Sequence, residues 1–203
     1  MVVESDYPRL YHGTEGLSLV GILRSGKLRP VMEQEEEAQR ENSNFRKSDY
    51  DKIVRLLDLP SLLITPNGGK RTIKQILKDE GIVLTRENYE SLRPRLVELE
   101  VQEGLRGLRE SPERQRYENV WFTSNQSKAK SYAPGGILLS FQIPQEIWDK
   151  AKLIGGKYVV AFPFAISLDY LKEVIYWDRN RKQLSKLQED FKKWNPLFLE
   201  YGK

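Results

Sequence analysis

The sequence predicts an α+β fold in which short strands surround a long helical segment. Apolar, β-rich runs occur near residue 10 and again after residue 119, and the stretch 31–116 between them is polar and helical in pattern. Strands and helices do not alternate regularly, as a doubly wound parallel sheet would require. A chain of 203 residues lies within the single-domain range. We therefore expect one domain over residues 1–203, with 31–116 as a helical insertion.

The first elements follow from local pattern. Residues 10–14 (LYHGT) predict a short strand that runs into a turn, and residues 17–28 carry apolar side chains at helical spacing. These side chains are Leu19, Ile22 and Leu23. Gly26 is expected to end that helix, because glycine adopts the left-handed conformation that commonly follows a helix.

The segment 31–116 predicts several helices separated by breakers. The expected interruptions are Pro60, the turn 66–69 (PNGG), Pro94 and Pro112. An acidic run at its start, Glu33–Glu41, holds five Glu and one Arg.

After Asn119 the pattern becomes β-rich. The expected strands are 120–123, 137–143, 157–162 and 171–177, and a short helix is expected over 126–133. A C-terminal helix over 180–194 places an apolar stripe on one face. The stripe consists of Leu184, Leu187, Phe191 and Trp194. We expect this stripe to pack on the body of the protein, and a docking face for a partner is the alternative.

Composition excludes several kinds of chemistry. The chain has no Cys and one His, so it has no disulfide, thiolate zinc site, iron–sulfur cluster or cysteine nucleophile, and no His-rich metal site. We expect no metal cofactor. The longest apolar run, 158–168, is about half the ~20 residues of a transmembrane helix. The first residues carry acids where a signal peptide carries bases. The expectation is a cytoplasmic protein without a membrane partner.

The charge pattern leaves the partner open. The chain carries 33 basic and 29 acidic residues, for a net charge of +4 and a pI near 9.1. Because the run 33–41 carries −4, the rest of the chain carries +8. This balance permits a nucleic-acid partner. Interleaved bases and acids are equally typical of a solvated helical surface.

The only histidine, His12, ends a predicted strand in the block Tyr-His-Gly-Thr. A half-buried histidine that is satisfied by backbone groups is one interpretation. The functional interpretation rests on its neighbours, since Gly13 permits close approach of a ligand or of a neighbouring backbone and Thr14 adds a hydroxyl. A neutral imidazole beside a bare peptide edge can bind a ribose hydroxyl and an amide together.

Three blocks resemble the conserved blocks of ADP-ribosyltransferases. They are residues 10–30 (LYHGTEGLSLVGILRSGKLRP), 120–141 (VWFTSNQSKAKSYAPGGILLSF) and 156–177 (GKYVVAFPFAISLDYLKEVIYW). The pattern is most similar to the His–Tyr–Glu branch, and the first and last blocks also resemble DarT-type DNA ADP-ribosyltransferase toxins. The resemblance implies a split β-sheet core and NAD as a substrate. It further implies a protein or nucleic-acid acceptor, and an antitoxin or partner protein that binds 31–116 or the C-terminal helix.

The resemblance also assigns roles to residues. His12 would bind the ribose of NAD, the Gly13 backbone would hold the nicotinamide amide, and Thr14 would supply a ribose-binding hydroxyl. Trp121 matches the Tyr of the family's second strand, and Tyr132 matches the aromatic residue that stacks on nicotinamide. The alternative for Trp121 is a role in core packing. The alternative for Tyr132 is that it is a half-exposed aromatic residue of a helix. Thr123 and Ser127 complete the expected lining of the pocket.

The catalytic carboxylate of the family has no counterpart in the expected place. Cleavage of the nicotinamide–ribose bond develops positive charge at the anomeric carbon, which a carboxylate stabilises. Lys157 occupies that slot here, and its charge opposes the reaction. Three explanations stand: a catalytically silent member, a substitution of an original Glu in a toxic protein, or another carboxylate such as Asp169 or Glu173.

Three functions therefore compete. The first is an NAD-dependent ADP-ribosyltransferase with His12, Tyr132 and the 157 slot as catalytic positions. The second is a silent nucleotide- or nucleic-acid-binding module on the same fold. The third is a helical nucleic-acid-binding protein in which the basic insertion and tail make the contacts.

Overall fold

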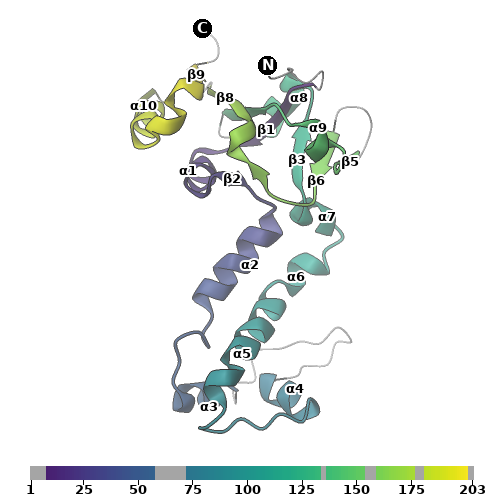
Figure 1. Ribbon diagram of the computed structural model, residues 1–203, viewed down its shortest axis with the longest axis vertical. Coiled ribbons are helices and arrows are strands. Elements are labelled where there is room, and N and C mark those ends of the chain that lie inside the picture. The colour runs from purple at the N-terminus through teal and green to yellow at the C-terminus, as the bar shows by residue number, and fades with distance from the viewer. Residues whose placement is uncertain (1–7, 58–71, 134–135, 154–158, 177–180, 201–203) are drawn as a thin grey trace. The chain divides into compact units, whose positions relative to one another are not determined.

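The computed structural model describes residues 8–57, 72–133, 136–153, 159–176 and 181–200. The chain divides into two compact units (Figure 1). The sheet unit comprises Met1–Val31 and Arg116–Lys203, and the helical unit comprises Met32–Gln115. The fold is α+β, as the sequence predicts. The helical unit matches the expected insertion to within one residue at each end, and the single-domain expectation stays a prediction.

The strands form one large and one small sheet. Seven strands run in the order β5-β6-β3-β1-β4-β8-β9, with antiparallel neighbours except for the parallel pair β8–β9, and β2 pairs with β7 in a two-stranded sheet. Their bounds are β1 Leu10–Thr14, β2 Lys27–Leu28, β3 Val120–Thr123, β4 Ile137–Phe141, β5 Lys152–Leu153, β6 Val159–Phe162, β7 Ile166–Ser167, β8 Leu171–Tyr176 and β9 Phe198–Glu200. The four strands expected after Asn119 are present as β3, β4, β6 and β8.

The helices fall into both units. Their bounds are α1 Gly16–Ser25, α2 Val31–Asn42, α3 Tyr50–Leu57, α4 Ile73–Asp79, α5 Tyr89–Gly104, α6 Arg106–Arg109, α7 Arg114–Glu118, α8 Gln126–Ser131, α9 Gln145–Trp148 and α10 Arg181–Asp190, with 3-10 turns η1 Leu168–Tyr170 and η2 Lys192–Leu197. Among the described helices, none has the length and apolar character to cross a membrane. The described residues also contain no cluster of three acidic or histidine side chains able to hold a metal ion.

The large sheet is buried on both faces around β4. Side chains alternate between the faces of a strand, and those of Ile137, Leu139 and Phe141 join the main core with the apolar face of α1. Leu138 lies on the opposite face, where it packs with the α8 side of the sheet. Every residue of β4 is therefore buried, which explains why four of its five residues are apolar, with Ser140 the exception.

Helix α1 agrees with its sequence pattern. The expected side chains Leu19, Ile22 and Leu23 are buried. Gly26 follows the helix in the left-handed conformation, with φ of 69°, and its N–H donates to the carbonyl of Ile22. The helix ends there because glycine adopts this conformation without a steric penalty.

The expectation of one C-terminal helix over 180–194 is wrong in its extent. Helix α10 ends at Asp190, and Phe191 leaves the helical conformation with φ of −123° and ψ of 53°. Trp194 then lies in the turn η2. Leu187 is nonetheless buried in the main core, and Phe191 and Trp194 pack against it. The described part of the stripe therefore packs on the body of the sheet unit, while the side chain of Leu184 lies outside the described residues.

The helical unit has a core of its own. It is built from Phe45, Ile53, Leu57, Ile73, Leu77, Leu96 and Leu99. The expected break at Pro94 is wrong, because α5 continues through that residue. Proline in a helix interior costs about 3 kcal/mol, and the burial of Leu96 and Leu99 just beyond it offsets this cost. The expected breaks at Pro60 and at 66–69 lie outside the described residues, and Pro112 falls between α6 and α7.

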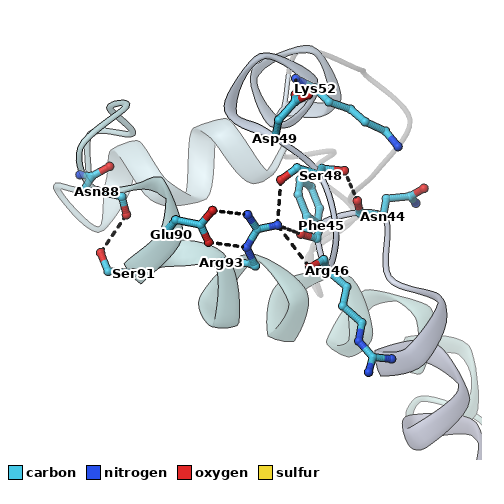
Figure 2. Close-up of polar contacts among 10 residues, drawn as sticks. All are labelled: Asn44, Phe45, Arg46, Ser48, Asp49, Lys52, Asn88, Glu90, Ser91 and Arg93. Atoms are coloured by element: carbon cyan, nitrogen blue, oxygen red, sulfur yellow. Dashed lines mark hydrogen bonds and ion pairs between the residues drawn. The ribbon is translucent and has the colours of Figure 1, made fainter.

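One arginine fastens the chain between α2 and α3 to helix α5 (Figure 2). Nη1 of Arg93 donates to the carbonyl oxygens of Phe45, Arg46 and Ser48, at 2.9, 3.2 and 2.7 Å. Its Nε and Nη2 donate to both carboxylate oxygens of Glu90, at 3.0 and 2.7 Å. The guanidinium thus donates hydrogen bonds to three backbone carbonyl groups of a connection that lies outside any helix or strand.

Replacement of Arg93 is expected to destabilise the helical unit strongly. The side chain of Arg93 is 18% exposed, so Arg93→Ala leaves three carbonyl groups poorly solvated and should lower the free energy of unfolding by about 2–4 kcal/mol. The control is Arg95→Ala on the same helix, which removes a surface ion pair with Glu80 at 41% exposure and should cost under about 1 kcal/mol. Urea unfolding measures both, and equal losses would contradict the assignment.

Candidate functional site

The sheet unit contains a cavity of about 570 Å³ around the only histidine. Its described lining consists of Tyr11, His12, Gly13, Arg116, Trp121, Phe122, Thr123, Ala129, Tyr132 and Val159. Three consecutive residues come from β1 and three from β3, so the cavity lies where these two strands meet. None of these described lining residues is acidic.

Strands β1 and β3 part beside the cavity. Their register contains one Cα pair, Tyr11 with Thr123, whereas β1 forms five such pairs with β4 and β3 forms four with β6. Continued pairing would have set His12 opposite Phe122 and Gly13 opposite Trp121. Separation of the strands at these positions exposes two backbone edges, which need other hydrogen-bond partners.

His12 bridges this opening with its side chain. The Nδ1–H group donates to the carbonyl oxygen of Trp121 at 2.8 Å, and the ring contacts that of Phe122 at 5.7 Å between centroids. This bond selects the tautomer in which Nδ1 carries the proton. In the neutral ring, Nε2 is therefore a hydrogen-bond acceptor.

The protonation state of His12 follows from its surroundings. Desolvation inside the protein lowers the pKa of His12 below its ordinary value of 6.5, and the hydrogen bond to the Trp121 carbonyl opposes part of this effect. At pH 7 the imidazole is neutral, so it can accept a hydrogen bond at Nε2.

Gly13 is required by the helix that covers the strand. A Cβ at this position would lie 2.8 Å from Cβ of Ala133 and 3.0 Å from the carbonyl carbon of Tyr132. The end of α8 therefore packs directly on the β1 backbone. Of the two expected uses of this glycine, the structure shows the close approach of a neighbouring backbone.

Aromatic residues border the cavity on the α8 side of the sheet. Tyr132 follows α8 and is 64% exposed, which leaves its ring accessible. The indole Nε1 of Trp121 donates to the carbonyl oxygen of Arg116 at 3.2 Å. Thr123 is buried, and its hydroxyl accepts a hydrogen bond from the Asn125 backbone at 3.1 Å. Trp121 and Thr123 thus line the cavity from β3, as their expected roles require.

Not every expected site residue reaches the cavity. Thr14 is buried opposite Ile137 in the sheet, and Ser127 is exposed on α8. Neither belongs to the described lining. Lys157, the residue in the slot of the family carboxylate, lies outside the described residues.

The two alternative carboxylates are engaged elsewhere. Asp169 lies in η1, where its carboxylate accepts a hydrogen bond from the hydroxyl of Ser167 at 2.9 Å. It does not belong to the described lining of the cavity. Glu173 on β8 pairs with Arg9 at 2.7 Å and is likewise absent from that lining. Neither is placed to stabilise positive charge beside His12.

Sequence reasoning missed half of the lining. Each of four missed residues lies within two positions of an expected residue, namely Tyr11 of β1, Phe122 of β3, Ala129 of α8 and Val159 of β6. Arg116 was missed for another reason: it precedes the strand β3 by several residues, in a helix whose sequence pattern is uniformly polar. A signal for it is its position as the last base before the Val-Trp-Phe-Thr strand.

A second cavity, of about 410 Å³, lies in the helical unit. Its described lining is mostly apolar, with Tyr50 of α3 and the bases Lys74 and Lys78 of α4 as its polar members. It holds neither a histidine nor a carboxylate among these residues. The His12 cavity is therefore the better candidate for chemistry.

Comparisons of the chain with family models, with curated proteins and with solved structures give no match. Function is accordingly inferred from the residues of the His12 cavity.

The packing of α8 on β1 predicts the effect of a single methyl group. Gly13→Ala forces the Tyr132–Ala133 backbone away from the strand and should lower the free energy of unfolding by about 1–3 kcal/mol. The matched control is Gly21→Ala within α1, where an added Cβ meets nothing within 4 Å. That change should be neutral or stabilising by up to about 1 kcal/mol. Thermal unfolding of both variants tests the contact, and an unaffected Gly13→Ala protein would contradict it.

The lowered pKa of His12 predicts a pH-dependent stability. Between the folded pKa and 6.5 the unfolded chain binds a proton that the folded chain does not, so stability is full above pH 6.5 and falls as the pH drops below it. Denaturant unfolding from pH 5 to 8 should show this loss, and His12→Gln should remove its contribution. Because the chain has one histidine, its single imidazole NMR signal reports the folded pKa directly. A folded pKa at or above 6.5 is the contrary result.

Proposed function

We propose that the chain is an ADP-ribosyltransferase-like protein whose His12 cavity binds NAD, with ADP-ribose transferred to a protein or nucleic-acid acceptor. The observation that carries the proposal is the oriented, neutral His12, which lines the cavity beside two separated strand edges. The three sequence blocks that resemble this family contribute β1, β3 with α8, and β6 to the cavity.

The geometry suits a ribose beside His12. Since Nδ1–H is held by the Trp121 carbonyl, Nε2 can accept a hydrogen bond from a ribose hydroxyl. The parted edges of β1 and β3 offer peptide groups of the kind that bind an amide such as that of nicotinamide. Both contacts would orient the glycosidic bond for cleavage. Such positioning lowers the entropic part of the activation barrier.

The aromatic border suits a planar base. The ring of Tyr132 is largely exposed at the cavity, and stacking of a flat heterocycle on an aromatic ring is favourable. Nicotinamide stacked in this way would be held as the leaving group. Trp121 gives a second aromatic surface on β3.

A catalytically silent nucleotide-binding module is the second candidate. It is favoured by the described lining, in which no carboxylate faces the place where positive charge develops. The two candidates share the NAD-binding step and differ in turnover, so separate measurements of binding and transfer distinguish them.

Labelled NAD tests the proposal. The wild-type protein should bind NAD, and His12→Ala should weaken binding at least tenfold because the ribose contact is lost. In cell extract, Lys157→Glu should raise label transfer roughly 100-fold or more, since a carboxylate stabilises the developing charge. Lys157→Gln, which removes the charge without adding a carboxylate, is the matched control and should gain far less.

The outcomes separate the candidates. NAD binding without transfer by any variant would favour the silent module. Transfer that does not depend on residue 157 would show that another group acts as the carboxylate. A wild-type protein that does not bind NAD would overturn both candidates.

A further inference from the structure

The cavity of about 410 Å³ in the helical unit has no part in the proposed function. Its volume falls within the range of about 300–1,000 Å³ that is typical of sites for small organic ligands. Its described lining includes Val54 and Leu57 of α3, Leu77 of α4, and residues 82–84 of the connection that follows α4. The cavity therefore has the size and the apolar walls of a ligand site.

The wall that follows α4 depends on how this helix ends. Gly81 has a φ of 71°, and its N–H donates to the carbonyl oxygen of Lys78 at 3.0 Å. The N–H of Ile82 donates to the carbonyl oxygen of Leu77 at 2.8 Å. This pair of bonds turns the chain away from the helix axis, with glycine in the left-handed conformation that the turn requires. Residues 82–84 then line the cavity instead of extending α4.

The lining extends from the core of the helical unit to solvent. Leu57 and Leu77 are buried in that core, and Ile82 and Leu84 pack against it. Val83, in contrast, is 73% exposed. A ligand in this cavity can therefore bury an apolar body against the core side and keep a polar head in water at the border formed by Val83.

The charged residues of the described lining are two lysines. Lys74 and Lys78 are four residues apart on α4, so their side chains lie on the same side of the helix. No carboxylate belongs to the described lining. Lys78 is exposed, and its flexible side chain can place the ammonium group beside a head group at the border. This lining favours an anionic head group.

The described lining suits an aliphatic body better than a nucleotide base. Tyr50 is its one aromatic residue. The guanidinium of Arg86 lies over the Tyr50 ring, 4.9 Å from its centroid, and pairs with Asp51 at 2.7 Å. One face of this ring is therefore already covered, and the remaining apolar walls come from Val, Leu and Ile side chains.

We propose that this cavity binds a small aliphatic carboxylate, with the hydrocarbon chain against the apolar walls and the carboxylate on Lys78. Removal of the hydrocarbon from water favours binding, and the lysine charge attracts an anionic head and repels a cationic one. The site is separate from the His12 cavity, because the two share no described lining residue. The inference does not depend on the proposed function.

Calorimetric titration of the full chain tests the inference with four probes: decanoate, hexanoate, decanol and decylammonium, each below the concentration at which it forms micelles. Decanoate should bind more tightly than hexanoate, by up to about fourfold for each methylene that becomes buried. Decylammonium has the same chain with the opposite charge, and it should bind at least about fivefold more weakly than decanoate.

Substitutions at the border separate the head group from the chain. Lys78→Gln should weaken decanoate binding about fivefold and change decanol binding less than about twofold, because an exposed ion pair contributes up to this much. Val83→Asp places a carboxylate at the border and should weaken decanoate binding while it tightens that of decylammonium. The matched control is Lys52→Gln, an exposed base of α3 that is absent from the described lining, and it should bind all probes as wild type does.

Methyl NMR signals locate the bound probe. Decanoate should shift the signals of Val54, which lines the cavity, and leave those of Val20, which packs against the core of the sheet unit, in place. Circular dichroism and the melting temperature check that each variant folds. If Lys78→Gln does not fold, Val83→Asp carries the comparison.

Several results would overturn the inference. They are wild-type protein that binds decanoate no more tightly than decylammonium, decanoate binding that is unchanged in both Lys78→Gln and Val83→Asp, and methyl shifts at Val20 in place of Val54. Equal losses for decanoate and decanol in Lys78→Gln also overturn it, since they show a structural role for Lys78. Each of these results leaves the proposed function standing, because NAD binding at His12 is measured separately.

Discussion

The seam between β1 and β3 is the constraint on which the sheet unit depends. It joins the β4-β8-β9 side of the large sheet to the β6-β5 side, yet it contains a single registered Cα pair. The hydrogen bond from His12 to the Trp121 carbonyl joins the two strands across this contact, between residues 109 positions apart. In the sequence, the helical unit lies between these two strands. The same parting of the strands opens the cavity, so the feature that weakens the sheet also creates the site.

Helix α8 lies against this contact between β1 and β3 and contributes Ala129 to the described lining of the cavity. Its end packs so closely on β1 that position 13 admits only glycine without a shift of the Tyr132–Ala133 backbone. That contact sets Tyr132 at the border of the cavity, beside the edge that Gly13 belongs to. The sequence suggested that Gly13 permits the close approach of a ligand or of a neighbouring backbone. In the structure Gly13 permits the close packing of the Tyr132–Ala133 backbone, and this packing sets the position of the Tyr132 ring.

The sequence predicted elements that carry a clear period and missed those that depend on distant partners. Gly26 ends α1 as expected, because the apolar periodicity of the helix and the glycine that follows it are both visible in the local sequence. Two-residue strands such as β2 and β7 are too short to show alternation in the sequence. They form by pairing with each other across a long stretch of chain. Pro94 misled because burial of Leu96 in the helical core outweighs a local penalty. Arg116 lines the cavity because of the tertiary fold, and the sequence marks it only as the last base before β3.

The charges of the described lining separate binding from turnover. Under the proposed function, a neutral His12 and a lining without a described carboxylate would bind NAD in its ground state, whereas bond cleavage develops positive charge at the anomeric carbon. Interactions that are equal in the ground state and the transition state tighten binding and leave the chemical step unaccelerated. A carboxylate in the slot of Lys157 would add the differential contribution that these residues do not supply. Under the proposed function, residue 157 would therefore govern the rate of transfer, and the residues beside the β1–β3 contact would govern the affinity for NAD.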